Sequence, residues 1–177
     1  MNPLTCTRDE FDEMAFSLAE STVGWRLQSK SDSFGRRVIW LEGTSTLQRG
    51  VDDDDDNNNN SKRLLITFFI TFNECYCQPQ LHFFPESPLD AQELCLWMKG
   101  VCFGASELEE NERPIVSMNF CEELQMALWG LHQCDTTLIL ETVLAGGIQG
   151  NLLELFLQSV ASLLGMDREL VPKSNSM

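Results

Sequence analysis

Cys134 has the surroundings in this sequence that best suit nucleophilic chemistry. His132 lies two residues before it, Asp135 follows it directly, and the hydroxyl residues Thr136 and Thr137 come next. A thiol in such a polar setting can exchange with an activated thioester. These residues alone leave two interpretations open, a reactive nucleophile and a thiol without a chemical role. We expect His132 to be a structural hydrogen-bonding residue rather than a general base.

The other chemical motifs exclude many enzyme classes. The sequence has no phosphate-binding Gly-x-x-x-x-Gly-Lys, no Gly-x-Gly-x-x-Gly after a strand and no Gly-x-Ser-x-Gly. Cys75, Cys77 and His82 could bind zinc in principle, but the cysteine spacing is unfavourable and a fourth ligand is not evident. On an extended strand Cys75 and Cys77 would share one face, opposite Tyr76. We therefore expect no metal and no cofactor.

The overall charge is strongly acidic. Twelve Lys and Arg residues stand against 27 Asp and Glu residues, which gives a formal charge of −15. Binding to nucleic acid or to an anionic membrane surface needs clustered cations, so this composition argues against both partners and favours a basic protein.

The sequence also bears on the compartment. It begins without a basic, apolar leader, and polar residues and glycines interrupt its longest apolar stretch, Thr142–Met166. Seven cysteines, an odd number, favour free thiols. We expect a cytoplasmic protein with one domain over residues 1–177 and no transmembrane segment.

The elements that must position Cys134 can be predicted from capping residues and periodicity. A capping box at Thr7 and Glu10 predicts a first helix over about Arg8–Thr22, with Trp25 continuing its spacing. The strands that we expect are Arg37–Leu41, a central Leu64–Phe72, Gln80–Phe84 after a break at Pro79, and a short one between Ile115 and Leu131. The further helices are Asp90–Lys99, Thr137–Leu144 and Leu152–Leu164, the last ended by Gly165.

Two acidic segments are expected to lie in solvent. Residues 50–62 hold five aspartates and four asparagines in a row, which predicts a disordered loop within the domain. A calcium site is disfavoured there, because adjacent aspartates lack the alternating ligands and the turn glycine of a calcium loop. Ser106–Arg113 is expected to be an exposed acidic segment. The whole order of elements predicts an α+β fold, with helices packed on an antiparallel sheet.

Three sequence blocks resemble one protein family. Trp129–Thr136 is similar to the Trp-x-x-Leu-His-Pro-Cys-x-Thr active-site segment of the autophagy ubiquitin-like-conjugating enzymes. Tyr76–Phe83 resembles the family's Tyr-x-x-Pro-x-Leu-Tyr-Phe, and Glu112–Ile115 resembles its Glu-His-Pro-Ile. Phe156–Gly165 is similar to the last helix of the family, so the resemblance covers roughly Leu64–Met166. The chain departs from the family at Gln133, which replaces a proline, at His82, which replaces a tyrosine, and in a longer stretch between Glu112 and Cys134.

The resemblance implies a fold like that of ubiquitin-conjugating enzymes and a defined reaction. Cys134 would receive a ubiquitin-like modifier, autophagy-related protein twelve, as a thioester from the activating enzyme, autophagy-related protein seven. It would then pass the modifier to a lysine of autophagy-related protein five. No cofactor is needed for this step, because the thioester already carries the activation free energy. The chain lacks the long insertion of the sister enzyme that conjugates a lipid-linked modifier, which favours the protein-conjugating branch.

Two residues are candidates for stabilising the oxyanion. The sequence has no His-Pro-Asn, the motif that supplies this donor in ordinary ubiquitin-conjugating enzymes. Tyr76, which belongs to a family block, and Asn119 could donate instead. As alternatives, Tyr76 could anchor a strand end and Asn119 could be an ordinary loop residue. The alternative function is a non-catalytic interaction domain of the same fold. A thiol redox protein is disfavoured because no Cys-x-x-Cys is present.

Overall fold

The computed structural model describes residues 4–48, 63–103, 113–147 and 150–172. The predicted loop at residues 50–62, with its rejected calcium site, lies outside these residues. The same holds for the acidic segment Ser106–Arg113 apart from Arg113 itself.

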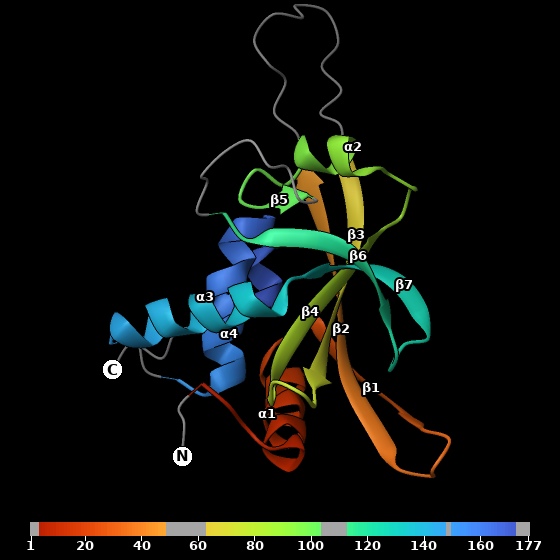
Figure 1. Cartoon of the computed structure of the whole chain (residues 1–177), viewed down its shortest axis with the longest axis vertical. Coiled ribbons are helices and arrows are strands. Elements are labelled where there is room, and N and C mark those ends of the chain that lie inside the picture. The colour runs from red at the N-terminus through yellow and green to blue at the C-terminus, as the bar shows by residue number, and fades with distance from the viewer. Residues whose placement is uncertain (1–3, 49–62, 104–112, 148–149, 173–177) are drawn as a thin grey trace, which may run out of the picture.

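A seven-stranded sheet forms the centre of the described structure, with the strand order β1-β2-β3-β4-β7-β6-β5 (Figure 1). Neighbouring strands are antiparallel, except that β5 runs parallel to β6. The strands are β1 (Trp25–Ser31), β2 (Arg37–Gln48), β3 (Arg63–Asn73), β4 (Gln78–Pro85), β5 (Cys102–Phe103), β6 (Ile115–Cys121) and β7 (Met126–Leu131).

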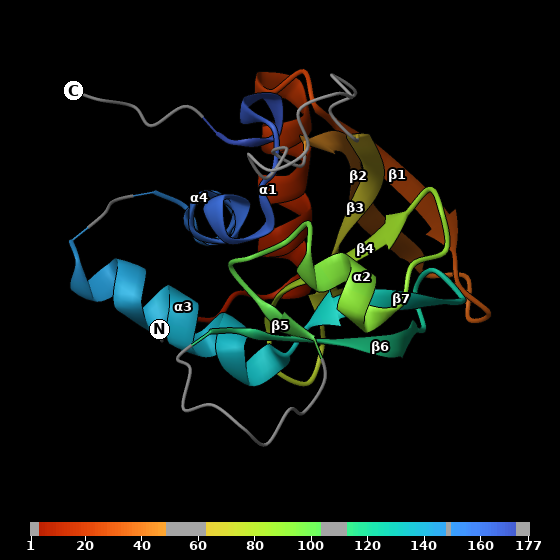
Figure 2. The same cartoon turned by 90° about the horizontal axis from the view of Figure 1, so that it is seen from above.

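The helices are α1 (Arg8–Ser21), α2 (Ala91–Cys95), α3 (Gln133–Ala145) and α4 (Leu152–Leu164), followed by a 3₁₀ turn, Arg168–Leu170. Seen from above, α1, α3 and α4 lie on one side of the sheet, and α4 contacts α1 (Figure 2). The capping box at Thr7 and Glu10 begins α1 as predicted, and Gly165, with a φ of 66°, ends α4. No helix among the described residues is long and apolar enough to cross a membrane.

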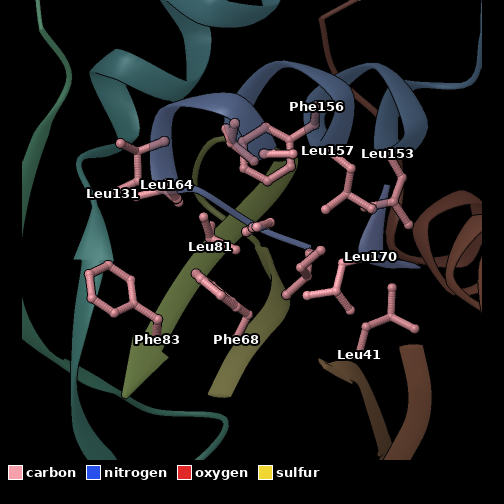
Figure 3. Packing of buried hydrophobic residues seen from close by; sticks show 14 of the residues in the cluster. Leu41, Phe68, Leu81, Phe83, Leu131, Leu153, Phe156, Leu157, Leu164 and Leu170 are labelled. Carbon is pink, nitrogen blue, oxygen red and sulfur yellow. The ribbon is translucent and has the colours of Figure 1, made fainter. Parts of the chain in front are cut away.

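The core lies between α4 and the central strands. Phe68 on β3 and Leu81 and Phe83 on β4 turn the same face of the sheet toward Phe156 and its neighbours on α4 (Figure 3). All four side chains are fully buried. The period-two pattern of the strands and the helical spacing of the α4 leucines therefore meet in a single apolar layer. This arrangement confirms the predicted α+β class and is consistent with a fold like that of ubiquitin-conjugating enzymes.

The structure corrects three predictions in the first half of the chain. The strand expected at Arg37–Leu41 extends to Gln48, and it pairs with a strand that was not predicted, Trp25–Ser31. Trp25 therefore starts β1 instead of continuing the helical pattern, and its indole N–H donates to the Leu170 carbonyl at 2.8 Å. Pro79 does not break the sheet but lies inside β4 opposite Phe72. A proline is tolerated near the beginning of a strand, where its missing N–H need not serve the ladder.

The second half of the chain also differs from the prediction. The single short strand expected between Ile115 and Leu131 is a hairpin of β6 and β7. The helix expected from Thr137 begins four residues earlier, at Gln133. That earlier start matters for the chemistry because it places Cys134 in the first turn of α3.

Candidate active site

Cys134 is the second residue of α3, and its side chain is exposed. The helix can begin here because His132 is its N-cap, with imidazole Nδ1 accepting a hydrogen bond from the Cys134 backbone N–H at 3.3 Å. The first N–H groups of a helix have no acceptor in the preceding turn, so they favour negative charge nearby. An exposed thiol at this position can be reached by another protein and can react where negative charge develops.

Asp135, the residue after the thiol, is hydrogen-bonded to the start of β6. Its Oδ2 accepts a hydrogen bond from the Ile115 backbone N–H at 2.8 Å, and the His132 backbone N–H donates to the Ile115 carbonyl at 2.9 Å. The start of β6 is thus bound on both sides to the cysteine segment. The Glu112–Ile115 block and the cysteine block, which are separate in the sequence, meet in the fold through Ile115.

Gln133, the residue before the thiol, is held by a contact with β4. Its Nε2 donates to Gln78 Oε1, at the start of β4, over 3.0 Å. Tyr76 lies two residues before Gln78, in the turn that joins β3 to β4, and the residue is 47% exposed. The Asn73 carboxamide oxygen holds the Tyr76 backbone N–H at 3.2 Å. The structure therefore ties the Tyr76 turn to the start of the cysteine helix through the Gln78–Gln133 contact.

The prediction for the two cysteines beside Tyr76 is wrong in its geometry. Cys75 and Cys77 are exposed residues of the turn and do not lie on one face of a strand. Cys77 has a φ of 53°, the left-handed conformation that reverses the chain. The third residue of the zinc hypothesis, His82, lies within β4 and is 2% exposed. No cluster of three His, Cys, Asp or Glu side chains suited to a metal occurs among the described residues.

Asn119 lies in the β6–β7 hairpin, away from Cys134. It pairs with Leu128 in the β6–β7 hairpin, and its amide donates to the Ser117 hydroxyl at 2.8 Å. Val116, the β6 residue opposite the end of β7 at Leu131, lies three residues from it. At about 3.3 Å per strand residue, Asn119 is about 10 Å further along the hairpin.

A cleft on the described surface lies away from Cys134. A cleft of about 750 Å³ opens between the β1–β2 and β6–β7 hairpins, with Phe34 and Phe120 on its sides, and Cys134 does not line it. A thiol that accepts a whole protein needs an accessible surface rather than an enclosed pocket, so the cleft does not decide the position of the active site.

Sequence reasoning missed Gln78, Gln133 and Thr137 as a group. The Thr137 hydroxyl donates to the same Gln78 oxygen at 3.0 Å. Gln133 was noted only as a departure from the family pattern, and nothing in the sequence marked its distant partner. The helical spacing of Gln133 and Thr137 was the one available signal, since residues four apart lie on one helix face.

Comparison with known proteins identifies the family. No curated protein matches the chain significantly. A family model does match: "Autophagocytosis associated protein, active-site domain", over residues 8–169. The matched region runs from the first residue of α1 to the 3₁₀ turn after α4, so it contains the complete sheet and the Cys134 helix. The chain therefore belongs to the family of autophagy conjugating enzymes, as a bearer of their active-site domain.

Proposed function

We propose that this protein carries a ubiquitin-like modifier as a thioester on Cys134 and transfers it to a lysine of an acceptor protein. Within the family we place it with autophagy-related protein ten. Its modifier is then autophagy-related protein twelve, its activating enzyme autophagy-related protein seven and its acceptor autophagy-related protein five. The observation that carries the proposal is an exposed thiol in the first turn of α3, in a chain that has the family's active-site domain.

The reaction is two successive acyl transfers. The Cys134 sulfur attacks the thioester carbonyl on the activating enzyme, a new carbon–sulfur bond forms, and the activating enzyme's thiol leaves with a proton. The acceptor's amine then attacks the new thioester, an isopeptide bond forms, and the Cys134 thiol is released. No oxidant or reductant takes part. Each step passes through a tetrahedral intermediate whose oxygen carries a negative charge.

The surrounding residues have distinct roles in this proposal. His132 positions the thiol by capping the helix, and its Nδ1 is already engaged by the Cys134 backbone. Tyr76 is the preferred oxyanion or lysine-orienting donor, because its turn is tied to the cysteine helix. Asn119 is the weaker candidate, because its amide is bound to Ser117 in the hairpin.

The decisive experiment is intact-mass analysis after incubation with activating enzyme, ATP and modifier. The wild-type chain should gain one modifier through a bond that a thiol reductant cleaves, and Cys134→Ser should lose that adduct or hold a reductant-resistant oxygen ester. Because Cys134 is exposed, this near-isosteric change should leave the fold intact.

Matched controls are available in the same molecule. Cys75→Ser and Cys77→Ser remove exposed thiols of the nearby turn and should keep the adduct. A wild-type chain that binds the modifier without ever forming the reducible adduct would instead be a non-catalytic interaction domain. A full reducible adduct on Cys134→Ser would move the proposed site to another thiol.

A further inference from the structure

The starting observation is a buried group of polar side chains beneath the cysteine helix. Gln78 and Gln133 are 3% and 6% exposed. Gln78 Oε1 accepts hydrogen bonds from Gln133 Nε2 and from the Thr137 hydroxyl, each at 3.0 Å. Two donors one helical turn apart on α3 thus converge on one oxygen of β4.

The remaining contact of Gln78 fixes which way its amide points. Its Nε2 donates to the Leu4 carbonyl at 2.9 Å, so its oxygen must face α3. Gln133 must then turn its own Nε2 toward the Gln78 oxygen. The Gln133 Oε1 atom is buried and has no hydrogen-bond partner within the part of the chain that the structure describes. An unpaired buried oxygen is unfavourable, and such an atom in a native fold calls for an explanation.

Gln133 occupies a helix position that proline often takes. It is the first residue of α3, where proline is preferred because its fixed φ suits the helix and its missing N–H is not needed. The preceding residue, His132, has φ −64° and ψ 137°, the conformation that a following proline requires. The backbone is therefore ready for a proline, and the chain places a long, flexible side chain there instead.

From these contacts we infer that Gln133 and Gln78 are positioning residues for transfer of the modifier from Cys134 to the acceptor amine. The buried Gln78–Gln133 contact supplies the rigidity that a proline ring would give. It fixes the start of α3, and with it Cys134, against the turn that carries Tyr76. The inference rests on the proposed function, and it assigns these residues to the transfer step rather than to loading.

The two steps differ in what they demand of this contact. In loading, Cys134 is the attacking group on a thioester that the activating enzyme holds, and its side chain is exposed. Transfer needs the thioester, the attacking amine and an oxyanion donor in one geometry. A displacement of about 1 Å between reacting groups can slow such a step about 100-fold.

The test compares single-turnover discharge of preloaded wild-type, Gln133→Met and Gln133→Pro proteins over a range of acceptor concentrations. Methionine keeps the length of the side chain and removes its amide, whereas proline removes the amide and restores rigidity. We expect Gln133→Met to load normally and to discharge about 10- to 100-fold more slowly at saturating acceptor. The half-saturating acceptor concentration should be unchanged, and Gln133→Pro should recover most of the rate.

Gln78→Met should reproduce the defect from the other side of the contact, and Gln28→Met, on β1, is the matched control for replacing a glutamine in the sheet. Amide hydrogen exchange at Asp135 and Thr136 gives a readout that does not require activity. Exchange should quicken in Gln133→Met and return toward the wild-type rate in Gln133→Pro.

The outcomes separate this inference from the proposed function. Wild-type protein that never loads would refute the proposed function, while hydrogen exchange would still test whether the contact fixes the helix start. If the wild-type protein loads and discharges and Gln133→Met matches its saturating rate, the positioning role is refuted. A Gln133→Pro protein as slow as Gln133→Met would also overturn it, because rigidity alone would then not be what the contact provides.

Discussion

His82 should make the stability of this protein depend on pH below neutrality. The imidazole lies in β4, is 2% exposed, and neither ring nitrogen has a hydrogen-bond partner within residues 4–48, 63–103, 113–147 and 150–172. Burial lowers the pKa of His82 from 6.5 to about 4. Gly130 packs against the ring so closely that a Cβ there would lie 2.9 Å from Nδ1. The folded state therefore holds this histidine neutral.

The sign and size of the effect follow from linkage. Below pH 6.5 the unfolded chain binds a proton at His82, whereas the folded protein does not bind it until about pH 4. Protonation therefore stabilises the unfolded state relative to the folded one. The contribution of neutral His82 to the free energy of unfolding is fully present above pH 6.5 and is lost progressively as the pH falls toward 4. The loss is about 2 kcal/mol at pH 5 and about 3 kcal/mol when both states are protonated.

The assay is urea denaturation followed by tryptophan fluorescence at pH 8 and pH 5, on wild-type protein and His82→Leu. Leucine does not titrate and leaves no unpaired nitrogen, so it should lose about 2 kcal/mol less than the wild-type protein between these pH values. Burial also raises the pKa values of Asp12 and Glu123, which opposes the histidine because an acid with a raised pKa adds stability as the pH falls. Those contributions are common to both proteins and cancel in the comparison. Equal losses of stability in the two proteins would refute the reasoning.

Two further changes test the neighbourhood of the thiol. Tyr76→Phe should load normally but discharge about 100-fold more slowly, since a hydroxyl donor acts where charge develops; single-turnover discharge of preloaded protein measures this, and an unchanged rate would leave the ring a packing role. Asp135→Ala should lose about 1 kcal/mol, because it removes an exposed hydrogen bond from the Ile115 N–H to a charged acceptor, whereas Asp135→Asn keeps an acceptor oxygen and should lose less. In thermal melts Asp135→Ala should lower the midpoint by about 2–4 °C, and equal midpoints for the two variants would contradict the hydrogen-bond argument.

The local signals in the sequence determined much of the fold. The capping box at Thr7 begins α1, the β-branched and aromatic run Leu64–Phe72 is the centre of β3, and Leu152–Leu164 is a helix with the predicted bounds. These predictions succeed because caps and periodicity act within a few residues of the chain. Cys134 could likewise be selected from its neighbours in the sequence and from the family block that contains it.

Contacts between distant segments decided the rest. Trp25 continued a helical pattern in the sequence, but it starts a strand because β2 pairs with it and Leu170 accepts its indole N–H. The sequence favoured Tyr76 over Asn119 only through a family block. The tertiary structure adds a physical reason, because it ties the Tyr76 turn to the cysteine helix and holds Asn119 in the β6–β7 hairpin. Gln78 and Gln133 are 55 residues apart, and nothing in the sequence distinguishes their amides from those of surface glutamines. Burial is what gives their contact its importance, since a polar group removed from water must find its partner inside the fold.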